Sequence, residues 1–367
     1  MNHSVETAAG PEVVGRKKRL SNMELLRIVA MLMVVAIHMC YYSFGSPTRA
    51  EVLQFSPFAM GRMAVQSFTV VCVDVFVLLS GYFGINASWK RLCGLLFQVL
   101  LLTMSAGLYY VWTDPDGSSY PYDRWLIDAF SLGGWFVRAY VLLYVISPVL
   151  NAFVRSATPR QLYRITLALL LLVILWGWRF RVEFSGGYSV AFFVVLYLLG
   201  RCVRLYPLRL FRLRWQIDML VYVMCSLLTV VMCVLGFCFR MYWAQAPSYV
   251  SPFTIAASVA LLLCFSKISF YSRWINWIAA SSFAVYLLHA CTPFLSVTMK
   301  PLVVGFWEPD AVGLFVVRCV AFALGLFAAC VLIDQVRLAL WRGLSGRIWT
   351  EKAPSGSATW AGSVEKK

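Results

Sequence analysis

The stretch SNMELLRIVAMLMVVAIHMCYYSF (Ser21–Phe44) decides the fold, because it is apolar over a length that can cross a lipid bilayer. A transmembrane helix needs about 20 predominantly apolar residues. The stretch nevertheless contains Arg27 and His38, whose side chains the hydrocarbon core of a membrane penalises. It therefore predicts a membrane-spanning helix in which two polar groups need an explanation.

The rest of the chain extends this prediction to an all-α, polytopic integral membrane protein. Of its 367 residues, 61% are hydrophobic and 13% are charged, whereas a soluble domain is about half apolar and a quarter charged. A single globular core of this size is too small to bury so many long apolar runs. We expect about ten transmembrane helices, three of them short (the fifth, sixth and eighth): Met23–Phe44, Ala64–Ile85, Leu92–Trp112, Gly134–Val154, Ile165–Trp178, Tyr188–Val203, Ile217–Phe239, Pro252–Phe265, Trp274–Phe294 and Ala311–Ile333.

The distribution of positive residues predicts the orientation of these helices. Of the 32 Lys and Arg residues, 22 fall on the side of the N-terminus and 7 on the other side, while Arg27, Arg138 and Arg318 lie inside spans. Cytoplasmic loops carry the excess of Lys and Arg, so both termini are expected in the cytoplasm. We expect a basic cytoplasmic N-terminus (1–20), a transmembrane domain (21–337) and a disordered cytoplasmic tail (338–367).

Charge and cysteine content argue against other classes of protein. The net charge of +16 comes from short clusters between apolar runs and not from one patch, which disfavours nucleic-acid binding. The 11 cysteines mostly lie inside apolar runs and match neither a disulfide framework nor a metal site, so no metal is expected. The first apolar run is too long for the core of a cleaved signal peptide, and we expect it to be retained.

Arg27 and His38 are predicted to share one face of the first helix. They are eleven positions apart, which at about 100° per residue is about 20° past three full turns. Along the helix axis they are separated by roughly 16 Å. Glu24 lies three residues before Arg27 and can pair with it.

Two interpretations of this face stay open. Near a helix end, Arg27 can reach the lipid headgroups with its long side chain and then needs no function. His38 lies too deep for that, and is either a structural residue bonded to another helix or part of a functional path.

Four segments, in this order along the chain, resemble the membrane acyltransferase-3 family. They are the Arg-x10-His pair in NMELLRIVAMLMVVAIH (Asn22–His38), VDVFVLLSGYFGI (Val73–Ile85), GGWFVRAYVLLYVISPVLN (Gly133–Asn151) and SSFAVYLLHA (Ser281–Ala290). The similarity covers the chain from Ser21 to about Arg337. Some members carry an additional hydrolase-like domain at the C-terminus, and we expect the membrane part alone to carry out the transfer here.

The resemblance implies a multi-pass enzyme of the bacterial cytoplasmic (inner) membrane that acylates extracytoplasmic glycans. The acyl donor would be acetyl-CoA or another acyl-CoA arriving from the cytoplasm, and the acceptor a hydroxyl of an envelope glycan or lipid-linked sugar. Arg27, Lys90 and Arg91 are expected at the cytoplasmic edge and are candidates to bind the phosphates of coenzyme A. The roughly 16 Å from Arg27 to His38 matches the reach of an extended pantetheine arm.

Three residues are candidates for the chemistry. We expect His38 to be the general base for the acceptor hydroxyl, with a transient acyl-histidine as the alternative. Asp74, a carboxylate in the middle of the second span, is expected to orient the His38 ring, or to make an interhelical hydrogen bond without a catalytic part. Arg138 can stabilise a developing oxyanion or an anionic acceptor, or can reach the headgroups. His289 is expected to be a polar tie between helices.

Two other functions compete with acyl transfer. A transporter or flippase for an envelope glycan could use Arg27 and His38 to line a passage, but the sequence shows neither repeats nor paired broken helices. A membrane scaffold without chemistry leaves His38 unexplained. The outer loops contain Trp, Tyr and Asp side chains compatible with sugar, and they do not identify which sugar.

Overall fold

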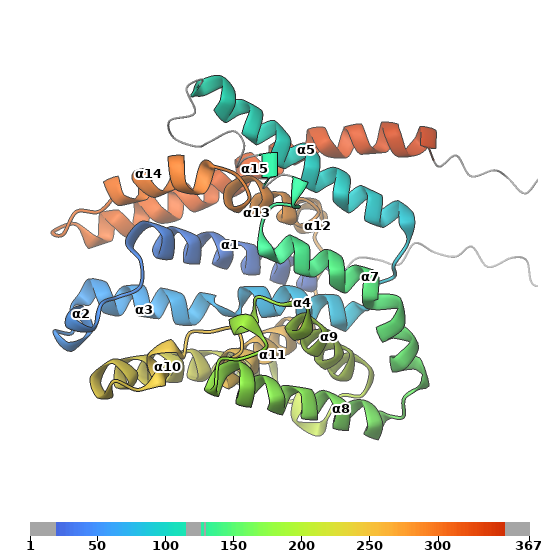
Figure 1. The fold of residues 1–367 in the computed structure, drawn as a ribbon, viewed down its shortest axis with the longest axis horizontal. Coiled ribbons are helices and arrows are strands. Elements are labelled where there is room, and N and C mark those ends of the chain that lie inside the picture. The colour runs from blue at the N-terminus through green and yellow to red at the C-terminus, as the bar shows by residue number, and fades with distance from the viewer. Residues whose placement is uncertain (1–19, 115–125, 128–129, 349–367) are drawn as a thin grey trace, which may run out of the picture.

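The computed structural model describes residues 20–114, 126–127 and 130–348 and is built from helices (Figure 1). No strand occurs within these ranges. The predicted all-α class is therefore confirmed. Most of the basic N-terminus (1–19), Arg124 and the end of the tail (349–367) lie outside the described residues.

Most of the helices follow one another with short connections, apart from the stretch between α5 and α7. Their bounds are α1 Ser21–Phe44, α2 Arg49–Leu53, α3 Pro57–Thr69, α4 Val71–Phe83, α5 Trp89–Thr113, α7 Trp135–Ser156, α8 Pro159–Leu172, η1 Val173–Arg179, η2 Ser185–Gly187, α9 Val190–Leu205, η3 Arg209–Arg212, α10 Trp215–Phe239, η4 Tyr242–Gln245, α11 Pro252–Lys267, α12 Arg273–Ala279, α13 Ser282–Ala290, η5 Leu295–Met299, α14 Lys300–Gly305 and α15 Val312–Ile348.

Polar side chains cap the N-termini of several helices, at positions between the apolar segments of the sequence. Thr48 and Thr158 form capping boxes with Glu51 and Gln161, and the Ser88 hydroxyl accepts a hydrogen bond from the Arg91 backbone at the start of α5. Such caps satisfy backbone N–H groups that have no partner inside the helix. Short polar connections thus divide the apolar chain into separate spans.

Within the described residues, seven helices are long and apolar enough to cross a membrane, and an eighth crossing is added if the bent pair Arg273–Ala290 and Leu295–Gly305 forms one span. Two shorter helices, α9 and α11, occupy the expected sixth and eighth positions. In the second span, α3 and α4 together run from Pro57 to Phe83, so the span begins earlier than the expected Ala64. The protein is a multi-pass membrane protein.

The ninth predicted span, Trp274–Phe294, is not one straight helix. It is divided into α12 and α13, and then bends by 71° into η5 and α14. Pro293 explains the bend, because proline has no N–H to donate to the carbonyl four residues earlier and its ring clashes with that carbonyl. The break therefore comes directly after His289, at the C-terminal end of α13.

Both ends of the described bundle lie on one side. Figure 1 shows the start of α1 and the end of α15 at the right, as an even number of crossings requires. The last helix continues to Ile348, past position 337 where we expected the tail to begin. We refer to the side where α1 begins as the entry side and to the opposite one as the far side.

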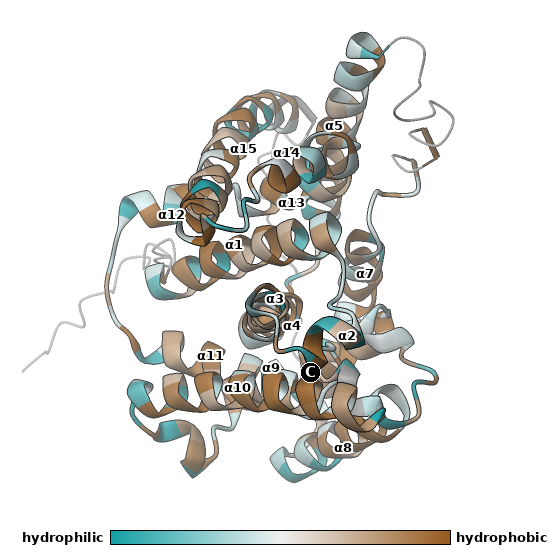
Figure 2. Cartoon of the chain, turned by 90° about the vertical axis from the view of Figure 1, so that its left-hand side faces the viewer, coloured by the Kyte–Doolittle hydropathy of each residue, from teal (hydrophilic) through white to brown (hydrophobic). Residues whose placement is uncertain are grey.

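The central helix is α1, which packs against α3, α4, α12, α13, α14 and α15. Glycine allows the neighbouring helices α4 and α9 to approach closely, because a Cβ on Gly81 would lie 2.3 Å from the carbonyl oxygen of Tyr197. Small residues commonly allow such contacts in membranes. Hydrophobic residues dominate the helices in Figure 2, and large apolar side chains such as Leu220 and Val317 are exposed, as expected of a lipid-facing surface.

Candidate active site

A pair of histidines lies at the centre of the bundle. His38 on α1 and His289 on α13 contact each other through Nδ1 of His38 and Nε2 of His289, which are 2.9 Å apart. His289 is fully buried, while His38 is half-buried. The other ring nitrogen of His289, Nδ1, lies 2.5 Å from the carbonyl oxygen of Val285. Two residues 251 positions apart in sequence therefore share one hydrogen bond.

These contacts determine which ring nitrogens carry hydrogen when both rings are neutral. The carbonyl oxygen of Val285 can only accept, so Nδ1 of His289 is the donor. Nε2 of His289 then has a lone pair and accepts from Nδ1–H of His38. The remaining nitrogen, Nε2 of His38, carries a lone pair and makes no hydrogen bond among the described residues. It is the nitrogen able to take a proton from a substrate.

His38 borders a small cavity of about 40 Å³. A cavity of this size holds a few water molecules. Its wall is mostly apolar and aromatic, with Tyr249 and Tyr286 as its phenol groups. Met31 and Val34 extend the wall along α1 from His38 towards Arg27. The remaining lining residues are Ile37, Cys72, Val73, Phe76, Trp135, Phe136 and Phe283.

The turn before α7 contacts Tyr286, one of the residues that line this cavity. Leu132 and Gly133 both have positive φ, of 65° and 67°. The backbone N–H of Gly134 donates to the sulfur of Cys291 at 3.3 Å, and a Cβ on Gly134 would lie 2.6 Å from Oη of Tyr286. Glycine at 134 is thus needed for the turn to contact the helix that carries His289.

Asp74 does not orient His38 in the structure. It is fully buried on α4, but neither of its carboxylate oxygens has a hydrogen-bond partner among the described residues. The predicted contact is replaced by His289. The reason is that α13, far away in sequence, packs against the same part of α1. Sequence position alone does not reveal this neighbour.

Arg138 lies one turn into α7, but its guanidinium points to the preceding turn. Its Nη1 donates to the carbonyl oxygens of Gly133 at 2.8 Å and Ser131 at 3.4 Å. The side chain does not border the His38 cavity. In this conformation Arg138 stabilises the turn that contacts Tyr286, and a direct role at the reacting atoms requires its side chain to move.

Arg27 lies on α1 towards the entry side, on the face of His38. Its guanidinium pairs with both carboxylate oxygens of Glu24, at 2.9 and 3.0 Å, as the spacing predicted. It also lies over the ring of Phe83, 5.9 Å from the ring centre. With 37% of its side chain exposed, Arg27 remains accessible to a ligand.

Polar side chains of α7 and α9 hold the connection between α4 and α5 in place. Tyr197 donates to the amide oxygen of Asn151 at 2.6 Å, while the Asn151 amide donates to the Ile85 carbonyl at 2.8 Å. The Tyr144 hydroxyl accepts from the Ser88 backbone N–H at 2.9 Å. These bonds fix the connection that directly follows Phe83, the residue whose ring lies under the Arg27 guanidinium.

Basic side chains from three helices surround this connection. Arg91 on α5 donates to the Asn86 carbonyl at 2.6 Å, and Lys90 beside it is exposed. Arg204 on α9 donates to the hydroxyl of Tyr82 at 3.0 Å. Arg201 lies against Gly84, where a Cβ would be 2.8 Å from its Nη1, and its buried Nε has no hydrogen-bond partner among the described residues.

Sequence reasoning missed Arg201, Arg204 and the role of His289. We counted the two arginines only as signals of orientation, since a loop position does not reveal that α9 packs on α4. His289 is the only other histidine in a predicted span, and that fact was a usable signal. Across the described part of the chain, no group of three or more His, Cys, Asp or Glu residues is arranged to hold a metal ion.

Comparison with known proteins agrees with this arrangement. The model of the acyltransferase-3 family, described as an acyltransferase domain, matches residues 20–334. No curated protein matches the chain, and no solved structure does. The matched region contains both histidines and the basic residues around the α4–α5 connection. The chain belongs to the acyltransferase-3 family and is a membrane acyltransferase.

Proposed function

We propose that the protein transfers an acyl group, most simply acetyl, from acyl-CoA to a hydroxyl of an extracytoplasmic or lipid-linked glycan. The observation that carries the proposal is the hydrogen-bond chain from Val285 through His289 to His38, which leaves Nε2 of His38 as a base beside a cavity. An unactivated sugar hydroxyl needs such a base. The protein would lie in the bacterial cytoplasmic membrane with the entry side facing the cytoplasm.

The basic residues on the entry side support coenzyme A as the carrier of the acyl group. Arg27, Lys90 and Arg91, to which we add Arg201 and Arg204, supply positive charge from three helices. Guanidinium groups bind phosphate oxygens through paired hydrogen bonds. With the phosphates at this position, the pantetheine arm would extend along Met31 and Val34, which line the way towards His38.

The proposed step keeps every atom and proton accounted for. Nε2 of His38 takes the proton of the acceptor hydroxyl while the hydroxyl oxygen attacks the thioester carbonyl carbon. The resulting oxyanion collapses, the carbon–sulfur bond breaks, and the proton passes from His38 to the departing thiolate. The products are an O-acyl ester and free coenzyme A.

His289 and the two tyrosines would assist this step. When His38 becomes cationic, its Nδ1–H bond to Nε2 of His289 holds the ring in place and spreads the charge. Tyr249 and Tyr286 line the cavity, and their phenols are candidates to donate hydrogen bonds to the oxyanion. This assignment gives the oxyanion role to phenols in place of Arg138.

The site must open before it can work. The cavity of about 40 Å³ has no room for a thioester and a sugar. The positive-φ turn at Leu132 and Gly133 precedes Trp135, and the bend after α13 follows Tyr286. Both Trp135 and Tyr286 line the cavity, so a change of shape in either segment would alter it without unfolding a regular helix.

The proposal is tested in the native host by the acetate that base releases from purified envelope glycans. Three strains are compared at equal membrane levels of protein: wild type, His38→Ala and a strain without the protein. We expect released acetate from the wild type alone. Equal acetate from wild type and His38→Ala contradicts the mechanism. Equal acetate from all three strains, with glycan precursor retained inside the strain lacking the protein, identifies a transporter.

A further inference from the structure

A second and larger cavity lies on the opposite side of α1. It measures about 470 Å³ and is bordered by α1, α3 and α15, with Leu32, Ala36, Gly61, Val65, Val316 and Val320 among its lining residues. Leu32, Ala36 and Cys40 follow one another at four-residue spacing, so they form one stripe along α1. His38, two positions from Ala36 and from Cys40, is about 160–200° away around the helix. This groove is therefore separate from the His38 cavity.

The groove is as long as one half of a bilayer. Its α1 wall runs from Leu32 to Phe44, a rise of about 18 Å. Half of the hydrocarbon core of a membrane is about 15 Å thick. At the far-side end the rings of Phe58 and Trp307 contact each other with centres 3.9 Å apart, next to Phe44 and Phe315. Tryptophan is enriched at the depth of the lipid headgroups, so Trp307 is consistent with this end of the groove lying there.

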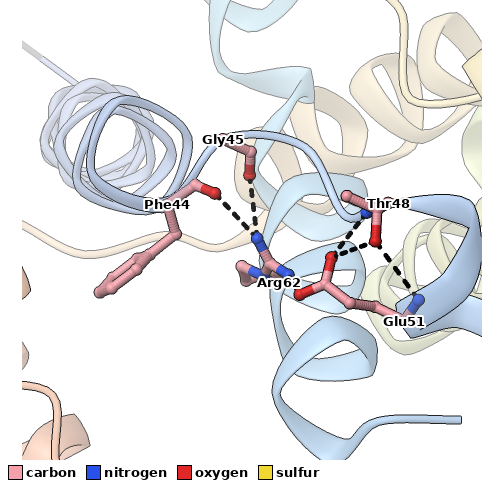
Figure 3. A network of polar contacts seen from close by, with 5 residues as sticks. All are labelled: Phe44, Gly45, Thr48, Glu51 and Arg62. Atoms are coloured by element: carbon pink, nitrogen blue, oxygen red, sulfur yellow. Dashed lines mark hydrogen bonds and ion pairs between the residues drawn. The ribbon is translucent and has the colours of Figure 1, made fainter. Parts of the chain in front are cut away.

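One charged side chain, Arg62, lines the groove at this aromatic end, and Figure 3 shows its contacts with Phe44 and Glu51. Its Nη2 pairs with Glu51 at 2.5 Å, and its Nη1 donates to the Phe44 carbonyl at 2.9 Å. The side chain is only 6% exposed, and its guanidinium lies over the Phe58 ring. Its Nε is buried and has no hydrogen-bond partner among the described residues. A buried donor without an acceptor costs about 1–3 kcal/mol.

We propose that the groove binds one acyl chain of a glycerophospholipid from the far-side leaflet, and that the Arg62 side chain turns towards the groove so that its Nε donates a hydrogen bond to the ester carbonyl. The apolar wall matches a hydrocarbon chain, and the length matches a single leaflet. The charge of Arg62 is already balanced by Glu51, so the remaining donor suits a neutral carbonyl better than a phosphate. An isoprenoid phosphate has no ester carbonyl to offer. The proposal is independent of the acyl-transfer reaction.

The bound chain would support the helix that carries His38. The α1 residues that it contacts, which include Leu32, Ala36 and Cys40, are on the side of the helix away from His38. Bound lipid fills a space that the protein's own side chains leave open and so restricts movement of α1 away from α13.

Gly61 provides a way to fill the groove from inside. A Cβ on Gly61 meets nothing within 4 Å, and glycine lowers helix stability, so Gly61→Leu should fold. The matched control is Gly325→Leu on α15, where a Cβ also meets nothing within 4 Å and which does not line the groove. Val320→Trp fills the groove from the other wall, with the exposed Val317→Trp as its control.

The full chain, stripped of lipid in detergent, is given dioleoylphosphatidylglycerol and measured by native mass spectrometry and thermal unfolding. We expect the wild type and both controls to retain one phospholipid more than Gly61→Leu and Val320→Trp. Added lipid should raise their melting temperature further than that of the two groove variants, because a ligand stabilises the state that binds it.

Equal lipid retention by the wild type and the folded groove variants overturns the proposal. The mass of the lipid that remains on protein purified from its native membrane gives a further result. A glycerophospholipid supports the proposal, whereas an isoprenoid phosphate lost in Gly61→Leu contradicts it.

Discussion

The two ends of the Arg27–His38 face differ in how their side chains are held. At the deep end, each polar contact has one arrangement: His38 bonds His289, and His289 bonds the Val285 carbonyl. At the entry end, Arg27 is 37% exposed and pairs with Glu24, a partner that it can exchange for another anion. The deep end is suited to orienting one reacting group, and the entry end to binding and releasing a charged ligand.

This contrast predicts different kinetic defects at the two ends. Loss of a group at the deep end should lower kcat, because its interaction matters in the transition state. Loss of a cation at the entry end should raise the KM for the acyl donor. The predictions below test the contrast in decreasing order of effect.

The largest effect is expected for His38→Ala. Removal of a general base lowers the rate by about 10²–10⁴-fold, with the KM for acyl-CoA nearly unchanged. The measurement is the release of free coenzyme A thiol by purified protein supplied with acyl-CoA and an acceptor glycan. His3→Ala, which changes a histidine ahead of the first helix, should keep full activity. A change in the KM for acyl-CoA without a loss of kcat would refute the assignment of His38.

The next effect is expected for His289→Ala, which removes the acceptor for Nδ1–H of His38. Residues that orient a metal-binding histidine contribute about 10–100-fold, and we expect a loss of this order for the orientation of His38. Gln at this position keeps a side-chain oxygen that can accept, so His289→Gln should recover part of the loss. A structural role alone predicts that both variants lose thermal stability and activity in parallel, which a melting curve measured beside kcat distinguishes.

A smaller effect is expected for Arg27→Ala, with a KM for acyl-CoA raised by about tenfold, or ~1.4 kcal/mol, and kcat little changed. Lys90→Ala and Arg91→Ala should each raise KM by less, because the basic residues around the α4–α5 connection share the charge. Titration with coenzyme A alone checks the order. A loss of kcat for Arg27→Ala at saturating donor would remove the contrast between the two ends.

The smallest effect concerns the far side, where hydrogen bonds from the backbone and hydroxyl of Thr48 lower the pKa of Glu51 below its ordinary value, assisted by Arg62. A carboxylate with a lowered pKa in the folded protein stabilises it at pH values above the unfolded pKa of about 4.3. This contribution is lost as pH falls through the folded pKa. The melting temperature of wild type should therefore drop at acidic pH more than that of Glu51→Gln, and identical profiles would contradict the account.

Much of the fold follows from local sequence, because a bilayer requires long apolar segments. The first span was expected at Met23–Phe44 and is found at Ser21–Phe44. The largest departure has a local cause: Pro293 bends the span predicted as Trp274–Phe294. Its effect on the path of the chain after the helix could not be read from hydropathy.

The site was less predictable, because it depends on which helices meet. The shared face of Arg27 and His38 required only helix geometry and is present. Identifying the partner of His38 required knowing that His289 on α13 contacts it and that Asp74 on α4 does not. Asp74 was chosen for its charge and depth, and its oxygens bond neither histidine. Arg201 and Arg204 reach the entry end only through the packing of α9 on α4.

The hydrogen positions on the two histidines test the central claim most directly. The chain has three histidines, so ¹⁵N-histidine labelling of a His3→Gln variant leaves His38 and His289 as the observed rings. Solid-state NMR of this variant in lipid bilayers at neutral pH reports which nitrogen of each ring carries hydrogen. We predict hydrogen on Nδ1 and a lone pair on Nε2 for both rings. Hydrogen on Nε2 of His38 would leave it without a free base towards the cavity and would contradict the mechanism.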